Sequence, residues 1–178
     1  RERATEEVAR DAAARTGSSY YAVIQPDGSR RHLPSTLFLP GVSDALDAFL
    51  SRVDTVLSVH GYGRDDDFWA VLVGGTNRTL AHHLAGHLRG LLPEEYRVVD
   101  DVGAMPSTLR GLHPDNPVNR PPGGGVQVEL PPGVRWNRDH RDWSDHDGTP
   151  RSEQLDLVIE ALVIALSDRP VGNGTSGP

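Results

Sequence analysis

The 178-residue chain contains no cysteine and no lysine, and each absence narrows its chemistry. Without cysteine, the chain can form no disulfide, use no thiol nucleophile and hold no cysteine-ligated zinc. Without lysine, all 18 basic residues are arginine, and they are outnumbered by 25 acidic residues to give a net charge of −7. Proteins that bind nucleic acid generally show a basic excess, so we expect no nucleic-acid partner.

Several common motifs and segments are also missing. No apolar run approaches the ~20 residues that a membrane-spanning helix needs, so we expect no membrane partner. The sequence has no phosphate-binding loop, no dinucleotide fingerprint and no Gly-x-Ser-x-Gly elbow, which argues against nucleotide enzymes and serine hydrolases. The chain begins at Arg1 and its only methionine is Met105. We therefore expect a truncated N-terminus, and leave open whether the protein is secreted or cytoplasmic.

The pattern of apolar residues predicts an α/β protein. Helical spacing indicates helices over residues 5–16, 42–53, 76–92 and 152–167. Short apolar runs indicate strands over residues 20–24, 55–59, 69–73, 96–99 and 126–130. This alternation predicts a three-layer α/β/α domain over residues 1–170 with a mixed, largely parallel sheet, followed by a disordered tail over 171–178. In such folds, function lies in the loops at the carboxyl ends of the strands.

Two polar residues stand at predicted strand ends. His60 directly follows the apolar run TVLSV and is followed by glycines at 61 and 63, which would let a substrate or metal approach the backbone. A histidine hydrogen-bonded beneath a tight turn explains the same pattern. Glu129 alternates with Val128 and Leu130, so it shares a strand face with Gln127. It is a candidate general base or metal ligand, and the alternative is a solvent-facing glutamate.

The segment 110–125, RGLHPDNPVNRPPGGG, is a long loop stiffened by proline. Its polar residues suit a polar substrate, with Asn116 and Asn119 as candidate contacts. Arg120 could make a bidentate contact with a carboxylate. The alternative is a surface connection, although loops of this length inside a domain are more often functional or disordered.

Five motifs together resemble one family. In chain order they are HLPSTLF (32–38), VLSVHGYG (56–63), VLVGGTN (71–77), LRGLHPDNPVNR (109–120) and GVQVELPPGVR (125–135). Their order and spacing resemble the poly-γ-glutamate hydrolase family of bacteria and phages, which are zinc-dependent amidohydrolases similar in fold to the zinc carboxypeptidases. The resemblance implies zinc as cofactor and poly-γ-glutamate or a related polyanionic peptide as substrate. We expect the protein to be a monomer.

The resemblance also implies roles for individual residues. The segment ERATEE (2–7) resembles the glutamate end of the family's metal-binding motif, which makes Glu2 and His60 the implied zinc ligands. The His-Gly-Gly part of that motif, with the third ligand, is expected just before Arg1. Glu129 matches the family's general base, which takes a proton from the metal-bound water.

Three further residues match positions near the family's active site. Asn119 and Arg120 match a substrate-binding pair, in which the arginine binds a carboxylate or stabilises the oxyanion. His32 matches a recurring His-x-x-Ser close to the site. A polyanionic substrate conflicts with the net charge of −7, so we expect Arg110, Arg120 and Arg135 to create a positive potential locally.

Two other functions fit the same residues. The first is a zinc peptidase or an N-acyl amino-acid amidohydrolase, which would keep the metal and the base and change the pocket. The second is a non-catalytic carboxylate-binding domain that has lost its metal site.

Overall fold

The main sheet of the computed structural model has four strands in the order β1-β4-β2-β3, within described residues 2–25, 33–63 and 67–168. They are β1 (Val56–Gly61), β2 (Ala70–Gly74), β3 (Arg97–Val99) and β4 (Gly125–Leu130). β1 pairs with β4 and β2 with β3 in parallel, whereas β2 and β4 are antiparallel. The predicted mixed, largely parallel sheet is therefore confirmed.

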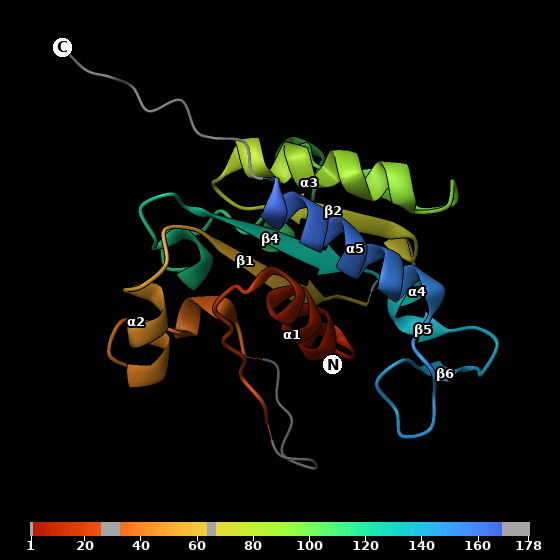
Figure 1. Cartoon of the computed structure of the whole chain (residues 1–178). Helices are drawn as coiled ribbons and strands as arrows, with labels where there is room; N and C mark the ends of the chain where they lie inside the picture. The colour runs from red at the N-terminus through yellow and green to blue at the C-terminus, as the bar shows by residue number, and fades with distance from the viewer. Residues whose placement is uncertain (1, 26–32, 64–66, 169–178) are drawn as a thin grey trace.

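Three helices cover one face of this sheet (Figure 1). They are α1 (Thr5–Thr16), α3 (Arg78–Leu91) and α5 (Glu153–Ser167), with α5 packed between the other two. The apolar stripe of α5 enters the main core, where Leu155, Val158 and Leu162 are fully buried. Burial of such a stripe is the main source of stability for a helix in a folded protein.

The other face carries no α-helix among the described residues and is covered by the segment 102–119. This segment forms three short 3-10 helices, η3 (Val102–Ala104), η4 (Ser107–Leu109) and η5 (Pro117–Asn119). A small second core of Tyr62, Ala70, Leu72 and Met105 lies beneath it. The layer predicted on this face is thus made of 3-10 turns, because closely spaced prolines and glycines prevent a longer helix.

Helix ends follow their capping residues. α1 ends at Gly17, which has a φ of 66°. The helix α2 (Asp44–Leu50) lies beside the start of β1 and is capped by Ser43, whose hydroxyl accepts from the Leu46 amide. Asn77 caps α3 in the same way. The predicted helices therefore exist, and α2 is shorter than predicted at both ends.

The predicted strand over residues 20–24 is wrong. The segment is not part of any described sheet, and a cavity of about 970 Å³ is lined both by it and by β1. A strand pairs with its neighbour through backbone hydrogen bonds, and residues 20–24 make no such bond to another described residue. The predicted tail at 171–178 lies outside the described residues, and the domain span 1–170 stays a prediction.

Two small elements were not predicted. Directly after β4 comes one turn of helix, α4 (Pro132–Arg135). It leads into a short hairpin of β5 (Trp136–Asn137) and β6 (Asp142–Trp143). None of the described helices has the length and apolar character needed to cross a membrane.

Candidate metal and acid–base site

His60 and Glu129 are direct neighbours at the carboxyl ends of β1 and β4. They are partners in the parallel register of the two strands. Val59 and Val128, the residues before them, pack on the helix-covered core, so both polar side chains point to the opposite face. The strand alternation thus places an imidazole beside a carboxyl group at one edge of the sheet.

Glu2 joins this pair from the start of α1. Its Oε2 atom lies 3.3 Å from Nδ1 of His60. The turn that carries Glu2 is fixed by Asp145, which accepts a hydrogen bond of 2.9 Å from the Ala4 amide and pairs with Arg3 at 3.3 Å. The Thr5 hydroxyl also donates to the Glu2 carbonyl. A loop more than 140 residues away thus holds this carboxylate against the histidine.

A chain of amides fixes the carboxyl group of Glu129. Gln127 Nε2 donates to Glu129 Oε1 at 2.8 Å, and Asn116 Nδ2 donates to Gln127 Oε1 at 2.7 Å. The Asn116 side-chain oxygen in turn accepts from the Val118 amide. Gly111 leaves room for Gln127, since a Cβ there would lie 2.7 Å from Gln127 Cβ. The chain of hydrogen bonds gives Glu129 one fixed orientation.

The surroundings shift the pKa of both site residues. Burial, followed by the negative charge of Glu2, raises the pKa of Glu129 to about 7, against opposing effects of His60, Gln127 and Arg135. Burial alone would lower the pKa of His60, but its hydrogen bond to Glu2 and the charges of Glu129 and Glu2 raise it overall. Glu129 can therefore both take up and release a proton near neutral pH.

The His60 and Glu2 pair fits part of a zinc site. Ligands at roughly 2.0–2.2 Å from a tetrahedral zinc lie about 3.4 Å apart, close to the observed 3.3 Å. Imidazole nitrogen and carboxylate oxygen are both ordinary zinc ligands. Catalytic zinc sites generally use three protein ligands, and the described part of the chain contains no cluster of three His, Asp or Glu suited to a metal. The residues present fit two of the three positions.

Two predicted substrate contacts lie away from this pair. Asn119 accepts from Thr76 and donates to the carbonyls of Gly111 and His113, beside the first residue of β4. The start of β4 is four residues from Glu129, about 13 Å along a strand. Arg120 donates to the Phe38 carbonyl and lies 3.8 Å from Asp47 in α2. Both residues belong to the opposite end of the strands.

The remaining predicted residues have different placements. Asn116 is only 4% exposed and supports Gln127, so the structure gives it a positioning contact. Arg110 donates to the Met105 carbonyl, and its own carbonyl accepts from Gly75. Of the three arginines expected near the site, Arg135 is the one whose charge acts on Glu129 and Glu2. His32 lies outside the described residues.

Gln127 was not identified as a site residue from the sequence, and Arg135 was expected near the site only as a source of positive charge. The signal for Gln127 was its place two residues before Glu129 on the same strand face. For Arg135, the only signal was its position shortly after the strand that carries the base. Contacts between a side chain and a distant part of the chain depend on the fold, so the local sequence does not predict them.

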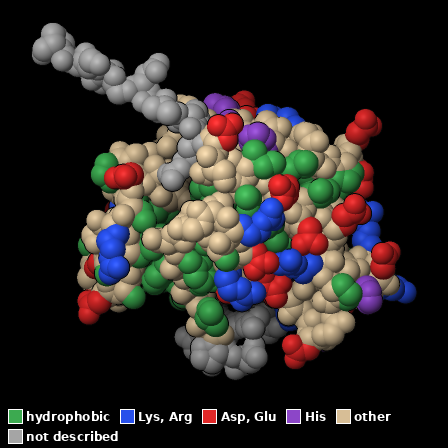
Figure 2. All heavy atoms as spheres, in the orientation of Figure 1, with side chains coloured by type: hydrophobic (Ala, Val, Ile, Leu, Met, Phe, Trp, Pro, Cys, Tyr) green, Lys and Arg blue, Asp and Glu red, His purple; other side chains and the backbone are tan. Residues whose placement is uncertain are grey.

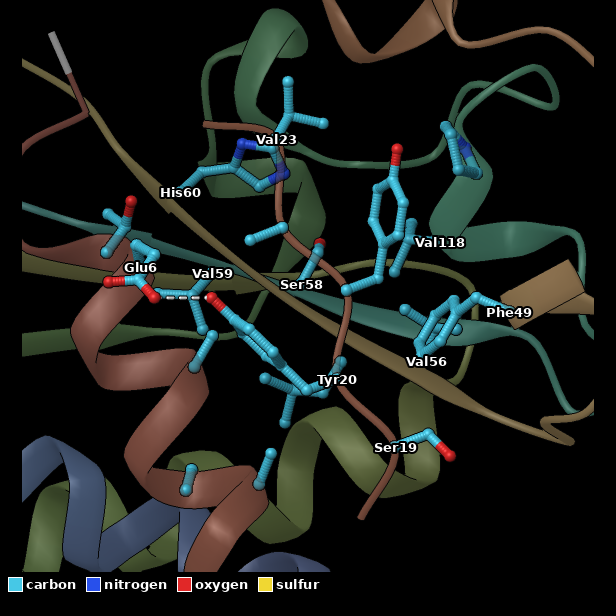
Figure 3. A pocket seen from close by; sticks show the side chains of 18 of the residues that line it. Glu6, Ser19, Tyr20, Val23, Phe49, Val56, Ser58, Val59, His60 and Val118 are labelled. Carbon is cyan, nitrogen blue, oxygen red and sulfur yellow. Dashed lines mark hydrogen bonds between the residues drawn. The ribbon is translucent and has the colours of Figure 1, made fainter. Parts of the chain in front are cut away.

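Two hollows meet beside Gly61. The larger is the cavity of about 970 Å³ along β1, which is lined mainly by apolar residues and reaches Glu2 and His60 at one end. Figure 3 shows Tyr20 in it, hydrogen-bonded to Glu6 of α1 at 2.7 Å. In Figure 2, apolar side chains gather in a recess between α1 and α2, and charged ones lie over α1 and α5. The smaller hollow, of about 280 Å³, is lined by Arg3, Gly61, Tyr62, Gly63, Arg135 and Trp143.

The mixed sheet, with polar groups at the carboxyl ends of β1 and β4, defines an α/β protein whose candidate site lies at one edge of the sheet. The profile of the poly-gamma-glutamate hydrolase family matches residues 1–156, and the chain belongs to this family. The resemblance seen in the sequence is therefore confirmed.

Two solved structures are similar to the chain. A bacteriophage poly-gamma-glutamate hydrolase has a TM-score of 0.71 and 26% sequence identity, covering 92% of this chain and 76% of its own. The zinc-free apo form of a protein called YndL has a TM-score of 0.70 and 22% identity, covering 96% of this chain and 80% of its own. No curated protein sequence matches the chain significantly.

Proposed function

We propose that the protein is a zinc-dependent hydrolase that cleaves the γ-glutamyl amide bonds of poly-γ-glutamate. The observation that carries this proposal is the buried Glu129, with a pKa of about 7, beside the His60 and Glu2 pair. Family membership and the phage hydrolase of similar structure support the polymer as substrate. The zinc-free form of YndL supports zinc as the metal.

In this proposal the two carboxylates have different roles. His60 and Glu2 would hold the zinc. When bound, zinc would act as a Lewis acid and lower the pKa of water. Glu129 accepts a proton from the water whose oxygen attacks the amide carbon. It then gives this proton to the nitrogen as the carbon–nitrogen bond breaks, so that a free amine leaves. Gln127 and Asn116 hold Glu129 in position for both transfers.

The substrate is proposed to extend over more than one binding position. Arg3 and the buried guanidinium of Arg135 lie beside the small hollow at Gly61, and their charge gives this side of the site a positive potential suited to a carboxylate, without a contact from Arg135. Asn119 and Arg120 lie near the start of β4, about 13 Å away, a distance that a polymer can span. Arg120 is proposed to contact the substrate away from the reacting bond, and His32 is a proposed substrate contact.

The decisive variant is E129Q. Gln can keep the hydrogen bond from Gln127 but cannot accept a proton, so we expect cleavage by the zinc-loaded protein to fall by about 10²–10⁴-fold. Polymer length is followed by gel filtration, and the matched control is E94Q, a change at an exposed glutamate between α3 and β3. Retention of more than a tenth of the activity by E129Q would contradict the role of the base.

One observation favours a second function. The large cavity that ends at Glu2 and His60 is mainly apolar, which suits the acyl group of an N-acyl amino acid. Faster cleavage of acylated small substrates than of the polymer would identify an amidohydrolase or zinc peptidase on the same scaffold. Polymer binding that weakens in R120A, without any cleavage, would instead identify a carboxylate-binding domain.

A further inference from the structure

We propose that Arg135 is a positioning residue that holds together the three chain segments carrying Glu2, His60 and Glu129. This inference rests on the proposed function, because it concerns the same site. Arg135 does not contact the substrate in this account. It acts through three backbone carbonyls, each next to or two residues from a proposed site residue.

The three hydrogen bonds come from one guanidinium group. Its Nε atom donates to the Leu130 carbonyl at 3.1 Å, directly after Glu129. Its Nη2 donates to the Tyr62 carbonyl at 2.5 Å, two residues after His60. Its Nη1 donates to the Arg3 carbonyl at 3.3 Å, directly after Glu2. These segments are far apart in sequence, and this side chain bonds to all of them.

Because Arg135 is buried, leaving any donor of its guanidinium without a partner would be costly. Arg135 is 1% exposed, and a buried charge is tolerated only when it is paired and hydrogen-bonded. The negative charges of Glu2 and Glu129 act on it, and its planar fork directs donors toward several carbonyls at once. Lysine presents a single ammonium group and cannot reproduce this fork. The position therefore requires arginine rather than any cation.

Two glycines near the site leave the space that this arrangement of Arg135 needs. A Cβ at Gly61 would lie 2.8 Å from Arg135 Cζ, so glycine after His60 leaves the space that the group fills. Trp143 lies on another side, with its ring centroid 5.3 Å from Cζ. A Cβ at Gly133 would lie 2.6 Å from the Trp69 ring, so this glycine lets the α4 turn pack closely. These glycines therefore serve the placement of Arg135.

The test compares R135K, R135M and G61A with a matched control, R78M. Arg78 also donates to three backbone carbonyls, those of Val73, Gly75 and Asp100, but at the opposite end of the sheet. All four variants are expected to lose stability. R135K keeps a positive charge but is expected to restore little of the stability and zinc affinity that R135M loses. G61A displaces the guanidinium without removing it.

Two readouts separate positioning from general stability. The first is amide hydrogen exchange in the metal-free proteins, where we expect faster exchange at residues 60–63 and 129–130 in R135K, R135M and G61A and no change there in R78M. The second is zinc affinity by chelator competition, expected to fall by about 10–100-fold in the first three variants and by less than two-fold in R78M. Unchanged exchange in R135K and R135M, or an equal effect of R78M, would overturn the inference. If the unmodified protein binds no zinc and the exchange still rises in these variants, the proposed function fails while the positioning role of Arg135 stands.

Discussion

At the scale of single residues, the site depends on two carboxyl groups in different surroundings. The Glu2 side chain is 38% exposed and lies against His60, whereas Glu129 is 5% exposed and sits in a network of amides. Burial raises the pKa of Glu129 to about 7. A buried carboxyl group with this pKa can act as a base, whereas an exposed carboxylate beside an imidazole can act as a metal ligand.

The raised pKa of Glu129 predicts how stability depends on pH. The folded protein holds a proton on Glu129 up to about pH 7, whereas the unfolded chain releases it near pH 4.5. Stability linked to this group is therefore fully present below pH 4.5 and is lost as pH rises to 7. E129Q lacks this loss, so its unfolding free energy relative to the unmodified protein should rise by about 3 kcal/mol between pH 4.5 and 8.

Urea unfolding of the metal-free proteins at several pH values measures this difference. The exposed Glu94 provides the control, because E94Q should follow the unmodified protein across the range. Parallel pH curves for E129Q and the unmodified protein would show that Glu129 is charged in the folded state throughout the range.

At the scale of elements, α4 and α5 place the residues that surround the site. Ser152 caps α5 by accepting from the Leu155 amide, and its hydroxyl donates to the Val134 carbonyl of α4 at 2.6 Å. Its own amide donates to the Ser144 hydroxyl. One buried serine thus connects the helix of the core to the turn that ends at Arg135.

Replacement of Ser152 should therefore destabilise the protein more than an ordinary surface change. We expect S152A to lower the unfolding free energy by about 1–3 kcal/mol, since it removes a cap and leaves buried polar groups unpaired. The control is S51A at the end of α2, where the hydroxyl donates to Ala48 on the exposed surface. Urea unfolding gives both values, and equal losses in the two variants would contradict the role of Ser152.

The elements also show what a sequence can predict. The caps at Ser43, Asn77 and Ser152 and the apolar stripe of α5 are local signals, and the helices form where they indicate. Residues 20–24 have the pattern of a strand, but a strand also needs a neighbour, which local sequence does not specify. The apolar runs over residues 55–59 and 126–130 predicted that His60 and Glu129 stand at strand ends. They could not reveal that Arg135 bonds to carbonyls from three distant segments, because that contact depends on the complete fold.

At the scale of the whole molecule, charge is distributed unevenly despite the net value of −7. Many acidic groups are paired with arginines on the helical surface, including Asp11 with Arg151 and Glu160 with Arg15. Arg3 and Arg135 face the small hollow at the site. Local potential rather than net charge governs the approach of a charged substrate, so a negative protein can act on a polyanion.

Zinc should stabilise the whole molecule if it binds the folded state. At a free zinc concentration of 100 times the dissociation constant, binding adds about 2.7 kcal/mol to the unfolding free energy. We expect the melting temperature to rise with zinc in the unmodified protein and in H113A, which removes an exposed histidine, but not in H60A. An equal rise in H60A would show that zinc binds elsewhere.

The central claim is that His60 and Glu129 serve a metal-dependent cleavage of poly-γ-glutamate. Its most direct test is the size distribution of the polymer after incubation with the zinc-loaded protein, measured by gel filtration, with H60A, E129Q and added chelator in parallel. The account predicts shortened polymer with the unmodified protein and full-length polymer in the other three samples. Full-length polymer with the unmodified zinc-loaded protein, or shortening that persists in H60A and E129Q, would contradict it.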